Sequence, residues 1–154
     1  MSKLASLAGV VALTAVALTA PTAQAAEPRP AESRALTAAA ADGKLHAWTE
    51  PYRGGAHCAW SGANRNWDYP GPGCQPMRNL ASSVENRGYA GGYDDVDLYY
   101  NEDQSGPYAC LGNGDMWLDL TLGREVFSHG LPWWDGYGES VNNNIASHSW
   151  TDSC

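Results

Sequence analysis

Four cysteines are the residues whose type points most directly to chemistry. They are Cys58, Cys74, Cys110 and Cys154, and they show no CxxC pair and no other spacing typical of a zinc site. In an exported chain an even number of cysteines is typical of disulfide bonds, and four cysteines allow three connectivities. The sequence therefore predicts two disulfides, with a zinc site as the weaker alternative.

The histidines are the next candidates for chemistry, and their spacing does not favour catalysis. His46, His57, His129 and His148 are scattered, and the sequence contains neither an HExxH motif nor a GxSxG elbow. A triad assembled from distant residues would be recognised only by its geometry. Isolated histidines are more often surface or structural residues, so we expect no catalytic residues and no enzymatic activity.

The element expected to position these side chains is a strand that enters a tight hairpin, residues 96–106. Apolar and aromatic residues alternate with polar ones from Val96 to Tyr100, the period of a strand with one buried face. Residues that tolerate turn geometry follow, and Gly106 closes the turn. The same pattern stands fifty-one residues earlier, from Leu45 to Gly55.

A second repeated segment closes each copy of this hairpin. Asn79-Leu80-Ala81-Ser82-Ser83 is echoed sixty-five residues later by Asn144-Ile145-Ala146-Ser147-His148. The chain is therefore interpreted as a duplication with units at about residues 44–90 and 94–154, which must share one core because each is too small to bury its own. Each unit holds two cysteines, so the duplication favours the pairings Cys58–Cys74 and Cys110–Cys154.

The first 43 residues differ in character from the rest. Residues 1–25 have one early lysine, an uncharged apolar run and the small-residue pattern Ala23-Gln24-Ala25, which is typical of a cleaved secretory signal peptide. Residues 26–43 are alanine-rich with two prolines and are expected to form a flexible leader, with a short helix at 33–41 as the alternative. We expect a secreted, extracellular protein without a membrane span.

Residues 44–154 are expected to form the folded domain. Every tryptophan, tyrosine, phenylalanine and cysteine lies in this range, and short segments punctuated by turns predict an all-β fold. Strands are expected at residues 45–48, 57–60, 83–85, 96–100, 108–111, 117–120 and 148–150. Two stretches rich in proline, glycine or asparagine, 64–76 and 128–144, are expected to be loops.

The charge of the chain limits its partners. The sequence carries 9 basic and 17 acidic residues for a net charge of −8, which becomes −9 without the lysine of the signal segment. A nucleic-acid partner is disfavoured, since phosphate binding needs a basic face. The acidity itself is an ordinary solubility feature of a secreted protein.

The two hairpins and their closing segments resemble the two Greek-key motifs of a βγ-crystallin-type domain. More closely, residues 44–154, with the preceding signal segment and the cysteines, resemble the I36 family of secreted bacterial peptidase inhibitors. This resemblance implies a βγ-crystallin-like sandwich of two Greek-key motifs. It also implies inhibition of a secreted protease, in particular a metalloproteinase, by a protein expected to be a monomer that needs no cofactor.

The same resemblance raises the question of calcium. Calcium-binding domains of this type end each unit in Asn/Asp-Asn/Asp-x-x-Ser/Thr-Ser, which corresponds to residues 78–83 and 143–148 in this alignment. Each segment departs from this pattern at one position, the first at Arg78 and the second at His148. The ligands implied by the resemblance are oxygens of Asn79, Ser82, Asn143, Asn144 and Ser147. The alternative is that these side chains cap turns by local hydrogen bonds, and we expect weak calcium binding or none.

Two stretches are candidates for an inhibitory loop, which must be exposed and lose little entropy on docking. Pro70, Pro72, Cys74 and Gln75 lie in a segment with three prolines that fix φ and a cysteine that tethers its end. Trp133 and Trp134 are the second candidate, because tryptophan anchors favour interface pockets. The alternative function is a calcium-stabilised or carbohydrate-binding module of the cell envelope, for which the tryptophans would offer a sugar-stacking face.

Overall fold

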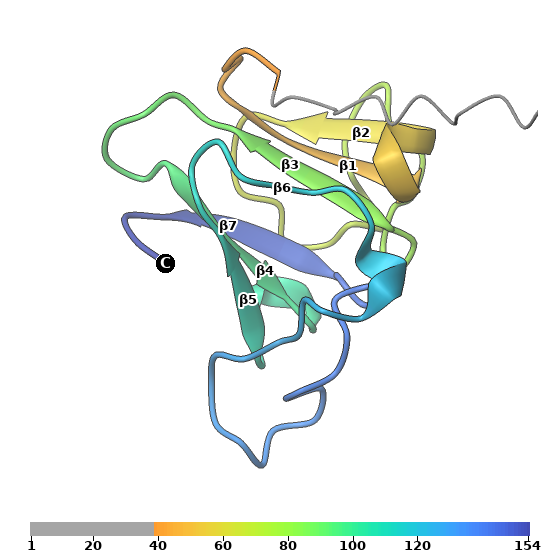
Figure 1. Ribbon diagram of the computed structural model, residues 1–154, viewed down its shortest axis with the longest axis vertical. Coiled ribbons are helices and arrows are strands. Elements are labelled where there is room, and N and C mark those ends of the chain that lie inside the picture. Colours follow the sequence, from red (N-terminus) through yellow and green to blue (C-terminus); the bar gives the residue numbers. More distant parts are fainter. Residues whose placement is uncertain (1–38) are drawn as a thin grey trace, which may run out of the picture. The chain divides into compact units, whose positions relative to one another are not determined.

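The computed structural model describes residues 39–154 of the 154-residue chain. The expected signal peptide, and the expected leader as far as residue 38, lie outside the described residues. The strands fall where alternating apolar residues predicted them, and they form two antiparallel sheets (Figure 1). The first sheet has the order β2-β1-β3-β6 and the second the order β5-β4-β7.

The strand bounds of the first sheet are β1 Lys44–Glu50, β2 Gly54–Trp60, β3 Ser83–Arg87 and β6 Met116–Trp117. Those of the second sheet are β4 Asp95–Tyr99, β5 Tyr108–Leu111 and β7 Ser147–Thr151. Three short 3-10 turns accompany them, η1 Pro51–Arg53, η2 Glu102–Gln104 and η3 Leu120–Leu122. One expectation was wrong: the strand predicted at 117–120 ends at Trp117, and Leu120 begins η3.

One hydrophobic core lies between the two sheets. Leu45 and Ala47 of β1 and Val96 and Leu98 of β4 are fully buried, as the alternation of their strands requires. Residues from the long connections complete this core, namely Trp67, Met77, Leu120, Phe127 and Val141. Residues from both halves therefore contribute to a single core.

The halves also exchange strands. β6 from the second half pairs with β3 of the first half, through Val84↔Trp117. Reciprocally, Asn64 from the first half bridges His148 of β7. This interlocking of the two halves is consistent with two Greek-key motifs in one domain.

The structure corrects the alignment of the closing segments by one residue. Ser83 faces Trp48 of β1, and Ser147 faces Tyr99 of β4, the equivalent of Trp48. Their hydroxyls donate to Glu50 O at 2.8 Å and to Asn101 O at 2.6 Å. The two segments are thus sixty-four residues apart rather than sixty-five, and the equivalents are residues 78–83 and 142–147.

Both disulfides join cysteines within one half, as predicted. Cys58 bonds to Cys74 and Cys110 bonds to Cys154, and the described residues contain no free cysteine. The described end of the expected leader contacts the first sheet, because Gly43 N donates to Arg87 O at 2.8 Å and Ala39 N donates to Glu85 Oε1 at 2.9 Å.

Candidate functional site

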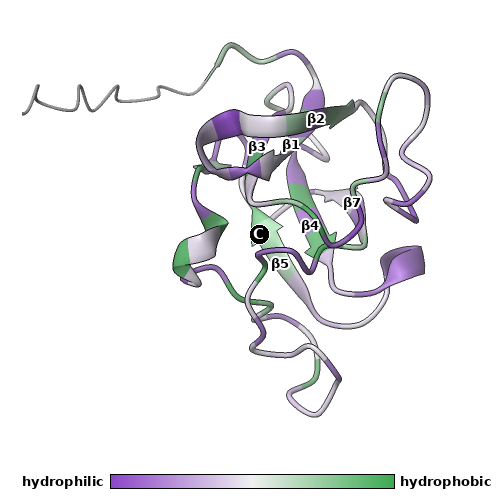
Figure 2. Ribbon diagram, turned by 90° about the vertical axis from the view of Figure 1, so that its right-hand side faces the viewer, coloured by the Kyte–Doolittle hydropathy of each residue, from purple (hydrophilic) through white to green (hydrophobic). Residues whose placement is uncertain are grey.

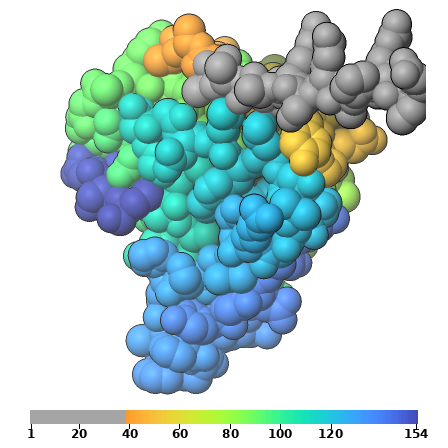
Figure 3. Space-filling model, in the orientation of Figure 1, coloured from red at the N-terminus to blue at the C-terminus, as the bar shows by residue number. Residues whose placement is uncertain are grey.

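The connection between η3 and β7 carries the most exposed tryptophan of the described chain. In the first half, the buried residues Trp67 and Met77 bracket the equivalent connection and are ten residues apart. In the second half their equivalents, Leu120 and Val141, are twenty-one residues apart. The second half therefore contains eleven additional residues, which project from the domain below the sheets in Figures 1 and 3.

Backbone hydrogen bonds hold the base of this projecting loop, which we define as residues 124–141. Phe127 N donates to Glu139 O at 3.0 Å, and Gly138 N donates to Phe127 O at 2.9 Å. On its other side, His129 exchanges two hydrogen bonds of 3.0 and 3.1 Å with Tyr108 of β5. The loop is thereby joined to the second sheet as an additional hairpin.

Side-chain packing fixes the loop further. The Phe127 ring is fully buried and meets Tyr100 edge to face, with 5.4 Å between ring centroids. Gly136 lies against the same Tyr100 ring at φ +90°, and a Cβ there would fall 2.4 Å from Tyr100 Cγ. Only glycine suits this backbone conformation and this close approach.

The tip of the loop presents its aromatic residues to solvent. Trp133 is 77% exposed and Trp134 is 41% exposed, so the second loop candidate is an accessible aromatic surface. Trp134 N donates to Leu131 O at 2.9 Å, and Tyr137 N donates to Trp134 O at 3.1 Å, so consecutive turns order the tip. The tip can bury a large apolar area against a partner at little conformational cost.

The other loop candidate lies in the first half and is tethered more tightly. Cys74 is held by its disulfide to β2, and Trp60 Nε1 donates to Pro70 O at 2.9 Å. Pro72 is exposed between these two tethers, and Gln75 is exposed directly after Cys74. This loop satisfies the requirement for a rigid, exposed segment, but its only large exposed apolar side chain is Tyr69, at its start.

The first of the two calcium-type segments does not fit a calcium ion. Arg78 occupies its first position, and the guanidinium forms ion pairs with Glu102 and, at 3.3 Å, with Asp68. Glu102 belongs to η2, the hydrophilic turn at the right of Figure 2. A positive charge supplied by the chain thus stands among the carboxylates that a metal would need. The fifth position of the other segment is Ala146, which lacks a hydroxyl.

The second calcium-type segment keeps suitable oxygen atoms. Asn142 Oδ1 is buried without a hydrogen-bond partner, and Ser82 Oγ lies 3.3 Å from Asn143 Oδ1. These donors suit calcium in type, but they are neutral, which favours weak binding. Ser147 serves the fold, since its hydroxyl also accepts from Gln104 N at 3.0 Å, and Asn144 Nδ2 donates to Ser140 O at 2.8 Å. Asn79 is exposed in left-handed backbone geometry at φ +56°.

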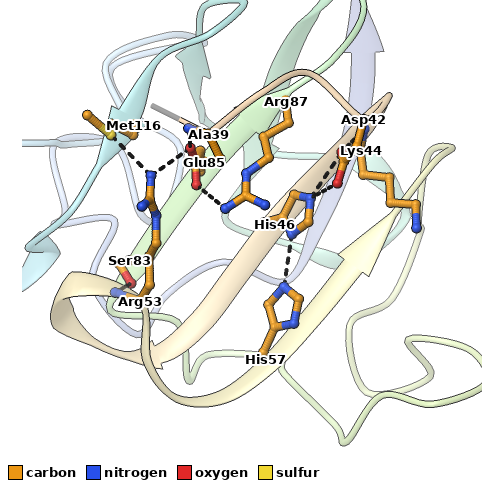
Figure 4. A network of polar contacts seen from close by, with 10 residues as sticks. All are labelled: Ala39, Asp42, Lys44, His46, Arg53, His57, Ser83, Glu85, Arg87 and Met116. Atoms are coloured by element: carbon orange, nitrogen blue, oxygen red, sulfur yellow. Dashed lines mark hydrogen bonds and ion pairs between the residues drawn. The ribbon is translucent and has the colours of Figure 1, made fainter. Parts of the chain in front are cut away.

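A polar network covers the outer face of the first sheet (Figure 4). Glu85 is 1% exposed and pairs with Arg53 at 2.8 Å and Arg87 at 2.7 Å. Burial alone would raise the pKa of Glu85, but hydrogen bonds from Arg87, Ala39 N and Arg53 outweigh it and lower the pKa. The carboxylate therefore stays charged and joins the segment before β1 to the sheet.

His46 and His57 extend this network across β1 and β2. His46 Nε2 lies 2.9 Å from Asp42 Oδ2, and its Nδ1 lies 2.9 Å from His57 Nε2. Burial lowers the pKa of both imidazoles, although Asp42 partly opposes the effect at His46. Within residues 39–154 no Ser, Thr or Cys side chain bonds to either ring, and no group of three or more His, Cys, Asp or Glu residues could hold a metal ion. This chain of contacts links β2, β1 and the segment before β1.

His148 is a buried structural residue rather than part of a calcium segment. It lies in β7, one residue beyond the corrected motif, and is fully buried. Trp67 Nε1 donates to His148 Nδ1 at 2.9 Å, so the proton of the ring is on Nε2, which donates to Gly62 O at 2.9 Å. Burial lowers the pKa of His148 to about 4. The neutral ring thus joins the exchanged segment of the first half to the second sheet.

Sequence reasoning found the projecting tryptophans but missed the ion pairs of Arg78 and the buried Glu85. Glu85 occupies an outward-facing position of β3, where a charged residue normally indicates a solvated face. A weak signal was available in the two arginines, Arg53 and Arg87, since buried carboxylates are usually paired.

Comparisons with known proteins support the architecture. No family model and no curated protein matches the sequence. A solved structure described as "Evolution of the eye lens beta-gamma-crystallin domain fold" superposes with a TM-score of 0.50 at 14% identity, over 74% of this chain and 90% of that one. A βγ-crystallin from Ciona intestinalis superposes with a TM-score of 0.47 at 15% identity, over 71% of this chain and 100% of that one. The N-terminal domain of protein S superposes with a TM-score of 0.45 at 17% identity, over 69% of this chain and 92% of that one.

The first of these likenesses, together with the two sheets, defines an all-β domain of βγ-crystallin type. At 14% identity it establishes the fold alone. No helix in the described range has both the length and the apolar character needed to cross a bilayer.

Proposed function

We propose that this protein is a secreted inhibitor of a peptidase, and that the tip of the projecting loop is the segment that enters the peptidase cleft. The observation that carries the proposal is the 77% exposure of Trp133 at the end of a loop whose base is fixed to the second sheet. The target class, a metalloproteinase, comes from the resemblance of the sequence to secreted peptidase inhibitors.

The location of the loop supports this role. It is an addition of the second half that the first half lacks, so the duplicated core does not require it. Loops held on a rigid scaffold commonly carry function, because they can vary without loss of the core. The sequence of residues 124–141 can vary in this way, and the base of the loop is nevertheless fixed by hydrogen bonds, which limits the entropy lost on docking.

The anchor chemistry also favours binding to a protein cleft. Tryptophans are enriched among the few interface residues that supply most of the binding energy. Proline at 132 fixes φ directly before Trp133 and limits the unbound conformations of the tip. Both disulfides lie outside the tip, so they stabilise the domain without contacting the docking surface.

The proposal is tested by inhibition assays of the folded, disulfide-intact protein against a panel of secreted metalloproteinases and serine proteases. Trp133→Ala should weaken inhibition of the sensitive enzyme by about 30-fold or more, which corresponds to the roughly 2 kcal/mol of a central anchor. The chain should remain intact during the assay. An unaltered melting temperature would show that the loss is local.

The control variant is Tyr69→Ala, which removes a side chain of similar size that is 80% exposed beside the proline-rich loop. It should leave the inhibition constant unchanged. Loss of inhibition in this control, or on Gly/Ser replacement of residues 70–73 with Trp133 intact, would transfer the function to the proline-rich loop. If no peptidase in the panel is inhibited at micromolar concentration, the proposal is wrong.

A further inference from the structure

A second aromatic site lies at the other end of the domain, where the segment that links the two halves passes the end of β7. A pocket of about 400 Å³ is lined there by Gly43, Ser61, Gly88, Tyr89, Gly92, Tyr93 and Trp150. This volume lies within the range of small-molecule sites, roughly 300–1,000 Å³. In Figure 1 the β3–β4 linker is far from the projecting loop, so the two sites are separate.

The pocket combines exposed aromatic faces with a backbone wall. Tyr89 is 68% exposed and Tyr93 is 67% exposed. A Cβ on Gly43 would fall 2.6 Å from the Tyr89 ring, and one on Gly88 would fall 2.8 Å from the Trp150 ring. The glycines therefore let the aromatic rings lie directly on the backbone and keep the pocket open above them.

The linker that carries the tyrosines is fixed by buried polar side chains. Asn86, which is 1% exposed, accepts from Gly88 N at 2.8 Å and donates to Asp94 O at 2.8 Å. Asn113 Nδ2 donates to Gly88 O at 3.0 Å. The linker is thus held at its start, at Gly88, and at its end, at Asp94, so the site is largely formed before any ligand binds.

The backbone of Tyr93 is an outlier that the fold does not explain. Among the described residues, seven non-glycine residues have positive φ, and six of them form pairs related by the duplication, namely Tyr52 and Asp103, Arg53 and Gln104, and Asn79 and Asn143. Tyr93, at φ +57°, has no such partner. Asp152 Oδ1 holds it by accepting from its N–H at 2.8 Å. Strained conformations of bulky residues are characteristic of functional sites.

The polar groups around the pocket indicate the chemistry of its ligand. Asp94 Oδ2 accepts from Gly91 N at 2.9 Å, and Asp152 accepts through Oδ1, so in each of these bonds one carboxylate oxygen is engaged and the other is left for a hydroxyl donor. Two carboxylates bonded to the linker backbone beside the pocket, with a net charge of −8 for the chain, disfavour an anionic ligand. A neutral sugar ring suits both the aromatic faces and the carboxylates, because its C–H face packs on an aromatic ring and its hydroxyls donate to carboxylate oxygens.

We propose that the pocket formed by Tyr89, Tyr93 and Trp150 is a binding site for a neutral saccharide. This site is independent of the projecting loop and of the inhibitor function. It would retain the secreted protein on a glycan surface while the loop at the other end remains free to meet a peptidase.

The test is titration of the full mature protein with neutral hexasaccharides, followed by calorimetry and by tryptophan fluorescence, to which Trp150 contributes together with the six other tryptophans. The probes are β-1,4-linked glucose, xylose and N-acetylglucosamine hexamers and the α-1,4-linked glucose hexamer, with a polygalacturonate hexamer as the anionic comparison. We expect at least one neutral probe to bind at millimolar concentration or below, and the anionic probe not to bind.

The variants are Tyr89→Ala and Tyr93→Gly, and the control is Tyr69→Ala, whose ring is also largely exposed but lies outside the pocket. Glycine accepts the positive φ of Tyr93, so this variant removes the ring without straining the backbone. Each pocket variant should weaken saccharide binding about tenfold or more and leave peptidase inhibition unchanged. The proposal is overturned if no neutral probe binds at 10 mM, a concentration that corresponds to a binding free energy of about −3 kcal/mol. It is also overturned if binding survives both pocket variants, or if a proline-rich peptide binds and the saccharides do not.

Discussion

Protonation of the buried His148 should control how this domain responds to acid. The ring is neutral in the folded protein, with a pKa lowered to about 4 by burial, against an ordinary value of 6.5 in the unfolded chain. Because the folded pKa is the lower one, its neutral form supports folding fully above pH 6.5. That support is lost as the pH falls from 6.5 toward 4.

The size of the effect follows from the difference between the two pKa values. Each unit of pKa corresponds to 1.36 kcal/mol, so linkage gives a loss of about 2 kcal/mol between pH 7 and pH 5 and about 3 kcal/mol at pH 4. Lowered pKa values of His46 and His57 act in the same direction. The contribution of His148 must therefore be measured as a difference between two proteins.

The comparison is wild type against His148→Gln, with urea unfolding at pH 7, 6, 5 and 4. Glutamine does not titrate and offers both a donor and an acceptor for the groups that contact His148, Gly62 O and Trp67 Nε1. The variant should be less stable at pH 7 but should lose about 2 kcal/mol less than wild type between pH 7 and pH 5. Equal pH dependence of the two proteins would refute the reasoning. If the variant does not fold, an NMR titration of the wild-type ring near pH 6.5 would refute it equally.

Three further outcomes are expected. Gly136→Ala should destabilise the protein by about 1–3 kcal/mol in thermal unfolding, since it strains a left-handed backbone and meets the ring of Tyr100; an unchanged melting temperature would contradict the packing described for the loop. Calcium should shift the wild-type melting temperature little, whereas Arg78→Asn should increase the shift because it removes the competing cation; equal shifts would show that the guanidinium is not what blocks the metal. Replacement of both Cys58 and Cys74 by serine should lower the free energy of unfolding by about 3 kcal/mol in chemical unfolding, because the disulfide is lost; unchanged stability would mean that this disulfide does not stabilise the domain.

The sequence predicted the strands well because their signal is local. Alternation at Leu45 and Ala47, and at Val96 and Leu98, identifies the buried face of a strand without knowledge of the fold. The within-half disulfides followed from the duplication, once the two hairpins had been recognised. The short strand at 116–117 was overextended, because an apolar pattern does not distinguish a strand from the 3-10 turn that begins at Leu120.

The register of the calcium-type segments could not be obtained in the same way. Identity of residue types matched Asn79 with Asn144, whereas strand pairing and the serine hydroxyl bonds match it with Asn143. A shift of one residue exchanges the two faces of a strand, so it moved His148 from the core to a supposed ligand position. Contacts across the sheet determine such a register, and they involve residues nearly fifty positions apart.

The outer face of the first sheet eluded prediction for a related reason. His46 and Glu85 stand at outward positions, where the pattern predicts solvent, and both are buried. What covers them is a short segment before β1 together with two arginine side chains, and neither can be assigned to this face from local sequence. The composition of the segment, rich in alanine, predicts only flexibility.

The unequal halves give the strongest argument about function. In a duplicated fold, the two equivalent connections must begin and end at buried positions. In the first half these positions, Trp67 and Met77, are ten residues apart, whereas in the second half their equivalents, Leu120 and Val141, are twenty-one residues apart. The additional residues bury Phe127 and Gly136 at their base, so they are folded, but they expose Trp133 at the tip, where a monomer gains nothing from it. A tryptophan held outward on a fixed base costs solubility and order, and the binding partner that we propose would offset that cost.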